Sequence, residues 1–183
     1  MSASGHLALI TGVGPGTGAA AARRFAAGGY RIAMLARGAD RLRQLESEIP
    51  GARGYACDVA DEAAIAATLD AVRGDMGDPD VFIHNAVGGV SGSQVVEGVM
   101  GTFQDIDPAA LEYNFRVNTL ALLHFARGLA PAMVARGRGA ILVTGNTAAT
   151  RGKPAFASFA PTKAAQRILA ESMARDLGPK GVH

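Results

Sequence analysis

The sequence predicts an α/β fold: a doubly wound parallel sheet in three layers, with helices on both faces. Two features predict it. Five short apolar runs alternate with segments of helical spacing, and these runs are nearly continuous, which is typical of strands buried on both faces. The length of 183 residues suits a single core. We therefore expect residues 1–183 to form one domain.

The predicted strands are short apolar runs that end at glycine or polar residues. They lie at residues 6–11, 31–37, 54–59, 80–86 and 139–145. The helical segments between and after them lie at residues 19–29, 39–49, 61–74, 107–137 and 161–178. The first helix ends at Gly28, the second before Pro50 and the last at Gly178. Asp61 is the expected N-cap of the third helix, and we expect the long fourth helix to bend near Pro131.

The composition argues against several classes of function. The 18 basic and 16 acidic residues leave a net charge of only +2 and are scattered, so we expect no nucleic-acid partner. The single Cys57 excludes an intrachain disulfide and fits a reducing compartment, and the four histidines are too dispersed for a metal site. The N-terminus has neither the charged start of a signal peptide nor an apolar run that could span a membrane. We expect a cytoplasmic protein that binds no membrane.

The segment TGVGPGTG follows the first predicted strand and opens the first helix. Glycine suits this place because the turn is tight and a diphosphate must approach bare backbone, while the helix N-terminus offers free N–H groups. The order of strand, glycines and helix predicts a dinucleotide-binding domain of the Rossmann type. The expected cofactor contacts come from Gly12, Gly14, Pro15, Gly16, Thr17 and Gly18.

Ligands in such folds bind at the carboxyl ends of the strands, so residues just after strands are candidates for function. Arg37 follows the second strand, with no acidic residue before Asp40. A carboxylate there would favour NAD, whereas Arg37 can pair with the 2′-phosphate of NADP. NADP(H) is therefore the expected cofactor in preference to NAD(H); the alternative is that Arg37 is merely solvated. The stretch 87–106 after the fourth strand is long enough to have a functional role.

With these motifs the chain resembles a classical short-chain dehydrogenase/reductase along essentially its whole length. TGVGPGTG matches the family's TGxxxGxG pattern. HNAV stands where the family has NNAG: Asn85 and Ala86 fit and are expected to contact the cofactor, while His84 and Val87 depart from the pattern.

The resemblance also implies roles for four other residues. Asp58 and Val59 stand where the family contacts the adenine. Asn118 falls where a helix asparagine supports the active site and its proton relay. Lys163 matches the lysine that binds the nicotinamide ribose and lowers the pKa of a neighbouring tyrosine.

Two catalytic positions of the family pattern are changed. Phe159 replaces the tyrosine four residues before the lysine, and Asn146 replaces the serine thirteen residues before that tyrosine. A phenyl ring has no proton to give, and an amide can donate a hydrogen bond but cannot act as an acid. One alternative donor is Lys163, acting through water with a pKa lowered by burial. The others are hydroxyls, which can equally be ordinary solvated or helix-face groups, on Thr147, Ser158 and Thr162.

The resemblance implies an oxidoreductase that moves a hydride to or from a small carbonyl or hydroxyl substrate, with an atypical proton donor. Reduction of a conjugated C=C bond is a variant, since Asn146 could stabilise an enolate while water protonates carbon. The alternative is a catalytically silent NADP-binding protein, a sensor or an inactive subunit, because both Ser and Tyr are lost.

Two further expectations rest on the resemblance. Family members usually continue past residues 178–183 into a strand, a substrate-covering segment and a last strand, so we expect this chain to be a fragment that lacks them. We also expect a homo-oligomer, a dimer or tetramer, formed through the helices at 108–136 and 160–177.

Overall fold

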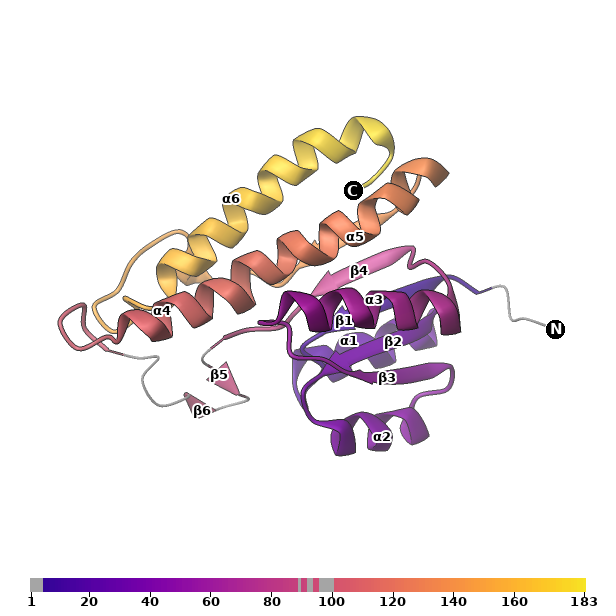
Figure 1. The fold of residues 1–183 in the computed structure, drawn as a ribbon, viewed down its shortest axis with the longest axis horizontal. Coiled ribbons are helices and arrows are strands. Elements are labelled where there is room, and N and C mark those ends of the chain that lie inside the picture. The colour runs from indigo at the N-terminus through magenta and orange to yellow at the C-terminus, as the bar shows by residue number, and fades with distance from the viewer. Residues whose placement is uncertain (1–4, 89, 92–93, 96–100) are drawn as a thin grey trace.

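The computed structural model describes residues 5–88, 90–91, 94–95 and 101–183. Its main sheet has five parallel strands in the order β3-β2-β1-β4-β7 (Figure 1). The strands are β1 (Leu7–Thr11), β2 (Arg31–Ala36), β3 (Ala52–Ala56), β4 (Val81–His84) and β7 (Ala140–Val143). The strand order reverses between β1 and β4, which marks the edge where such folds bind ligands. The predicted doubly wound sheet is confirmed.

Helices cover both faces of the sheet, as expected for three layers (Figure 1). On one face α1 (Thr17–Ala27) and α2 (Ala39–Glu48) pack over a core that includes Ile10 and Met34. On the other face lies a larger core built around Phe82 and Phe125. The helices that contribute to this second core are α3 (Glu62–Met76), α5 (Ala121–Arg136) and α6 (Ala160–Leu177).

Most of the predicted helix ends are confirmed. The Asp61 carboxylate accepts hydrogen bonds from the first-turn amides of α3, and Gly28 and Gly178 follow the last residues of α1 and α6. The third strand was predicted too far along the chain: β3 begins two residues earlier, at Ala52, and ends three residues earlier, at Ala56. Cys57 and Val59 follow β3 and are buried under α3. Their apolar side chains therefore indicate burial rather than a strand.

The predicted fourth helix has an irregular turn well before Pro131, where the sequence predicted a bend. Helix α4 (Pro108–Phe115) leads into a π-helical turn, Arg116–Leu120, and α5 then continues through Pro131. The amide of Ala121 donates to the carbonyl of Arg116, five residues earlier. Such turns are frequent at functional sites, and this one contains Asn118.

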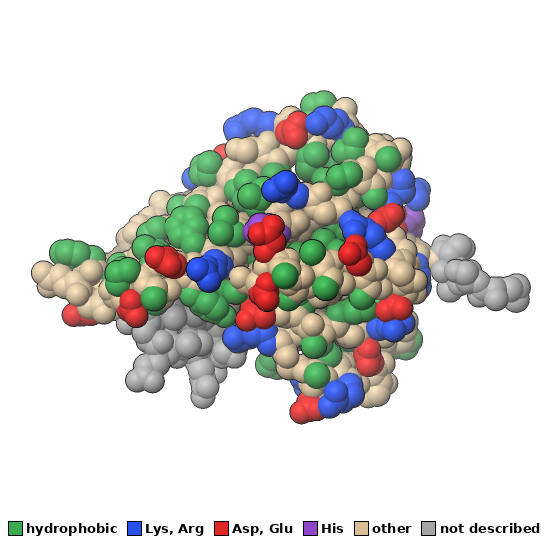
Figure 2. Space-filling model, viewed as in Figure 1, with side chains coloured by type: hydrophobic (Ala, Val, Ile, Leu, Met, Phe, Trp, Pro, Cys, Tyr) green, Lys and Arg blue, Asp and Glu red, His purple; other side chains and the backbone are tan. Residues whose placement is uncertain are grey.

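The same helical stretch is apolar enough to need a comment on membranes. Within Pro108–Arg136 an 18-residue window reaches a mean hydropathy of 1.2, which by length and composition would allow a membrane span. More than half of that window, 56%, is buried inside the fold, as for the core helix of a globular domain. Figure 2 shows acidic and basic side chains interspersed over the visible face, with apolar side chains between them.

The loop predicted at 87–106 contains two short strands, β5 (Val90–Ser91) and β6 (Gln94–Val95), which pair antiparallel. Residues 89, 92–93 and 96–100 lie outside the described part of the chain. After α6 the last residues run parallel to β7: Val182 bridges to Gly139, and the amide of Ile141 donates to the carbonyl of His183 at 2.6 Å.

Candidate active site

The glycine loop combines tight packing with open space. Gly12 has φ +68°, and a Cβ added there would lie 2.6 Å from the amide nitrogen of Ala86. By contrast, a Cβ on Gly14 or Gly16 would have no atom within 4 Å. No side chain among the described residues caps α1, and its first turn, from Thr17, contains no acidic residue. The loop therefore offers bare backbone and an uncapped helix N-terminus, which suit a diphosphate.

The end of β4 holds this loop in shape. The side-chain amide of Asn85 donates to the carbonyl of Gly12 at 2.9 Å. The Thr11 hydroxyl accepts from the backbone amides of Asn85 at 3.2 Å and Ala86 at 3.3 Å. Asn85 and Ala86 are thus placed to support the loop from the neighbouring strand.

Two expected adenosine contacts lie on the exposed rim after β2 and β3. The Arg37 guanidinium is exposed and lies 3.4 Å from the hydroxyl of Tyr113 on α4. The Asp58 carboxylate, also exposed, accepts from the amide of Ala60 at 3.0 Å, while Val59 is buried beneath. Both charged groups are therefore accessible at the carboxyl edge of the sheet.

Asn118 is completely buried and joins three segments. Its Oδ1 accepts from the amide of Gly88 at 3.0 Å, and its Nδ2 donates to the Thr162 hydroxyl at 2.9 Å. That hydroxyl in turn donates to the carbonyl of Phe159 at 2.8 Å. The loop after β4 and the start of α6 are thereby tied to the π-helical turn. Since Thr162 already donates to the backbone, its hydroxyl is a poor candidate for the proton donor.

Lys163 lies one residue further along α6 and is only 3% exposed. Its Nζ donates to Oε1 of Gln166 at 2.7 Å and to the carbonyl of Thr144 at 3.3 Å. Both partners are uncharged, so neither contact supplies a negative charge to balance the buried ammonium. Burial lowers the pKa of Lys163 to about 8. The amine can therefore release or take up a proton near neutral pH.

Phe159 and Asn146 occupy very different surroundings. The Phe159 ring is buried against Ala148 and Phe156, and its centre lies 6.0 Å from Nζ of Lys163. Asn146 is exposed at the end of β7, where its Oδ1 accepts from the amide of Ala148 at 2.8 Å. This contact orients the side chain and leaves its Nδ2 as a donor.

The two other hydroxyl candidates differ in accessibility. Thr147 is exposed at the start of a short 3-10 turn, Thr147–Ala149. Ser158 is completely buried, and its carbonyl accepts from Nδ2 of Asn114 at 3.1 Å. Thr147 is thus the hydroxyl that a substrate in solution could reach.

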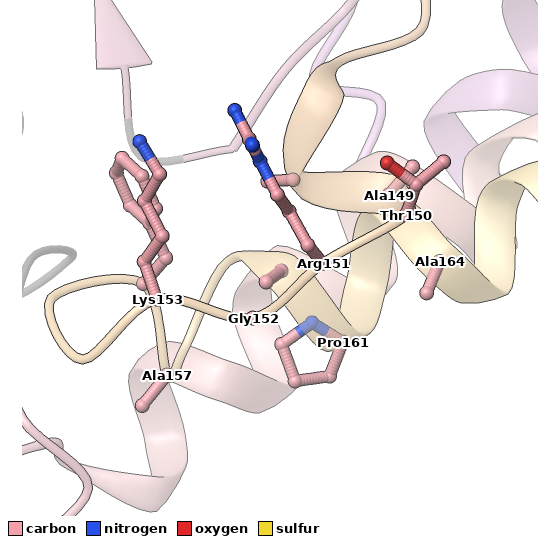
Figure 3. A pocket seen from close by; sticks show the side chains of 11 residues that line it. Ala149, Thr150, Arg151, Gly152, Lys153, Ala157, Pro161 and Ala164 are labelled. Carbon is pink, nitrogen blue, oxygen red and sulfur yellow. The ribbon is translucent and has the colours of Figure 1, made fainter.

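A hollow of about 400 Å³ lies beside the Phe159 cluster. Figure 3 shows Arg151 and Lys153 extending from the loop before α6, while Pro161 and Ala164 come from α6 itself. Lys163 and Asn118 do not line this hollow. It abuts the site through Ala148, Phe156 and Ala160, which pack with Phe159.

Sequence reasoning missed two residues near the site. Gln166 accepts from Lys163, and the available signal was its place three residues after the lysine on the same helix face. His84 is completely buried between β1 and the π-helical turn. The sequence marks His84 only as a departure from the family pattern, because its partners are distant along the chain.

Comparisons with known proteins identify the family of the chain. The family model described as short chain dehydrogenase matches residues 6–183. The chain is 32% identical to D-erythrulose reductase from Gallus gallus over 180 residues, 98% of this chain and 68% of that protein. The chain thus spans about two thirds of the length of this relative.

Solved structures show the same likeness. A metagenomic short-chain oxidoreductase in complex with NADP superimposes with a TM-score of 0.88 and 32% identity, covering 100% of this chain and 81% of the other. An NAD+-bound xylitol dehydrogenase gives a TM-score of 0.87 and 29% identity, covering 100% of this chain and 69% of the other. From the match over residues 6–183 and these relatives, the chain belongs to the short-chain dehydrogenase/reductase family of NAD(P)-dependent oxidoreductases.

Proposed function

We propose that this chain acts as an NADP-dependent oxidoreductase on a small carbonyl or hydroxyl substrate, with Lys163 as its acid–base group. The observation that carries the proposal is the buried Lys163, whose pKa is lowered to about 8. Its neighbour along α6, Thr162, accepts a hydrogen bond from Asn118, and the glycine loop offers open backbone for the cofactor. Relatives named for erythrulose and xylitol support a small polar substrate. The bound nicotinamide would supply or accept the hydride.

The chain's own side chains would handle the charge that hydride transfer creates. A hydride added to a carbonyl carbon leaves the electron pair of the C=O bond on oxygen, as an alkoxide. The Asn146 amide would hydrogen-bond this oxygen, and the Lys163 ammonium would give up a proton to it through a water molecule. An acid with a pKa near 8 suits such a transfer at neutral pH. In the C=C variant, hydride adds to the β-carbon, Asn146 binds the enolate oxygen and water protonates the α-carbon.

The preference for NADP rests on Arg37. Its exposed guanidinium stands at the end of β2, where a 2′-phosphate would meet a positive charge. Replacing Arg37 by alanine should raise the Kd for NADPH about tenfold and leave that for NADH nearly unchanged, since one charge-assisted contact is lost. Arg43→Ala is the matched control, because Arg43 is also exposed and pairs with Asp40 on α2. An equal effect of Arg37→Ala on both cofactors would contradict the assignment.

Binding itself is tested by adding one methyl group to the loop. Gly14→Ala fits the folded chain without a clash, but its Cβ would occupy the space in which the diphosphate must lie. We expect unchanged thermal stability and a loss of NADPH binding of at least about tenfold in a fluorescence titration. Gly74→Ala, equally free of clashes on α3, should bind as the wild type does. Tight binding by Gly14→Ala would place the cofactor elsewhere.

A turnover assay separates the enzyme from a catalytically silent NADP-binding protein. The silent alternative is favoured by the loss of both serine and tyrosine. A panel of ketoses, polyols and enones is assayed by NADPH absorbance, with Lys163→Met as the comparison. Wild-type turnover that Lys163→Met abolishes supports the proposed acid. If the wild type binds NADPH without turnover, Asn146→Ser with Phe159→Tyr shows whether only the proton donor is missing. Gain of carbonyl reduction by that double variant would identify a silent relative with an intact pocket.

We also propose a cytoplasmic homo-oligomer that assembles through the helices around α5 and α6. Leu120, in the π-helical turn before α5, and Ile168, on α6, support it, because these apolar side chains are 41% and 50% exposed. The single cysteine, Cys57, is free and buried, which suits a reducing compartment.

A further inference from the structure

His84 is a fully buried histidine at the switch point of the sheet. The register of the parallel strands pairs His84 with Thr11, at the ends of β4 and β1. Side chains alternate along a strand, so His84 projects to the same face as Phe82, the face that α5 covers. This places the imidazole between the strand that leads into the glycine loop and the π-helical turn that carries Asn118.

Both ring nitrogens of His84 lie within hydrogen-bond distance of a partner. Nε2 is 3.2 Å from the carbonyl oxygen of Asn118, and Nδ1 is 3.2 Å from the Thr11 hydroxyl. A carbonyl can only accept, so Nε2 must carry the hydrogen, and in a neutral ring Nδ1 is then an acceptor. The Thr11 hydroxyl must therefore donate to Nδ1.

The other contacts of Thr11 fit this direction. Its oxygen already accepts from the amides of Asn85 and Ala86, so its one hydrogen is free to point at His84. The other acceptor within reach, the carbonyl of Ile83, is farther away at 3.5 Å. The hydrogen bonds thus form one continuous chain, from the amides after β4 through Thr11 and His84 to the carbonyl of Asn118.

We propose that His84 is a positioning residue that links the glycine loop to the active-site turn. Through Thr11 and Asn85 it determines where Gly12 lies, and through the carbonyl of Asn118 it determines where the π-helical turn lies. Among the described residues no direct hydrogen bond joins Thr11 to Asn118, so the imidazole bridges them. His84 itself need not touch substrate or cofactor.

A pair of amide variants separates the two halves of this link. In His84→Gln the side-chain nitrogen can occupy the place of Nε2 and still donate to Asn118. In His84→Asn the shorter side chain can reach Thr11 but not Asn118. NADPH is titrated against wild type and both variants by fluorescence, with thermal unfolding recorded for each. Because this readout rests on the proposed cofactor, the wild-type imidazole is also examined by ¹⁵N NMR without NADPH.

We expect the Kd for NADPH to rise about tenfold in His84→Gln, which loses the hydrogen bond to Thr11 beside the glycine loop, and to stay within about threefold of wild type in His84→Asn, which keeps it. NMR should show the neutral Nε2–H tautomer at pH 7. Equal affinities in wild type and His84→Gln, or equal losses in both variants, would overturn the inference, as would an Nδ1–H tautomer. If His84→Gln does not fold, the tautomer decides. If the wild type binds no NADPH, the proposed function fails while the tautomer still tests the link.

Discussion

Replacing Lys163 by methionine tests whether burial of this charged side chain lowers the free energy of unfolding. Methionine keeps the length and apolar stem of the side chain but removes the charge. Burial lowers the lysine pKa from its usual 10.5 to about 8. Because each tenfold change in proton affinity corresponds to about 1.4 kcal/mol, the buried ammonium destabilises the fold by about 3 kcal/mol.

The sign of the effect follows from which state binds the proton more tightly. Below pH 8 both folded and unfolded Lys163 are protonated, so the full cost is present. Between pH 8 and 10.5 the folded chain loses the proton first, and wild-type stability therefore rises with pH across this window. The methionine variant lacks that rise. It also leaves Gln166 and the carbonyl of Thr144 unpaired, a loss of about 1–3 kcal/mol that does not depend on pH.

The assay is urea unfolding of both proteins between pH 7 and pH 10.5. The unfolding free energy of the variant minus that of the wild type should fall by about 3 kcal/mol from pH 7 to pH 10.5. Other titrations cancel because the two proteins share them. Lys153→Met is the matched control, because Lys153 is exposed and also lies above a phenyl ring, Phe156, at 5.7 Å. Parallel stability curves for Lys163→Met and wild type would refute the buried charge.

Three other predictions concern neighbouring features. Burial, with a smaller contribution from the charge of Lys163, lowers the pKa of His84 from 6.5 to about 4. Because the unfolded chain binds the proton more tightly, the unfolding free energy should fall by about 3 kcal/mol from pH 6.5 to pH 4. The variant His84→Gln should lack this fall. Gln166→Glu puts a carboxylate where the amide now lies 2.7 Å from Lys163, so the lysine pKa and the alkaline limb of a pH–rate profile should move upward; an unmoved limb would exclude Lys163 as the titrating group. Ile168→Glu adds charge to a side chain that is 50% exposed on α6, and light scattering should show a smaller assembly at equal protein concentration; an unchanged mass would place the interface elsewhere.

The sequence by itself determined the sheet, its helices and the glycine loop. These follow from local rules: apolar runs become buried strands, and only glycine tolerates the φ of +68° and the close backbone of Ala86 at Gly12. The loss of the tyrosine and serine was visible in the same way, as letters at known spacings. The shifted β3 shows the limit of such rules, since Cys57 and Val59 are buried without being in a strand.

Only the tertiary structure decided which polar groups meet inside the site. His84 is joined to Thr11 across 73 residues and to Asn118 across 34, so no local pattern marks it as a link between loop and helix. The lowered pKa of Lys163 likewise depends on burial and on uncharged partners that the fold brings to it. Residue type and spacing report what a side chain can do, whereas its burial and its partners, which set its charge state, arise only when distant segments pack together.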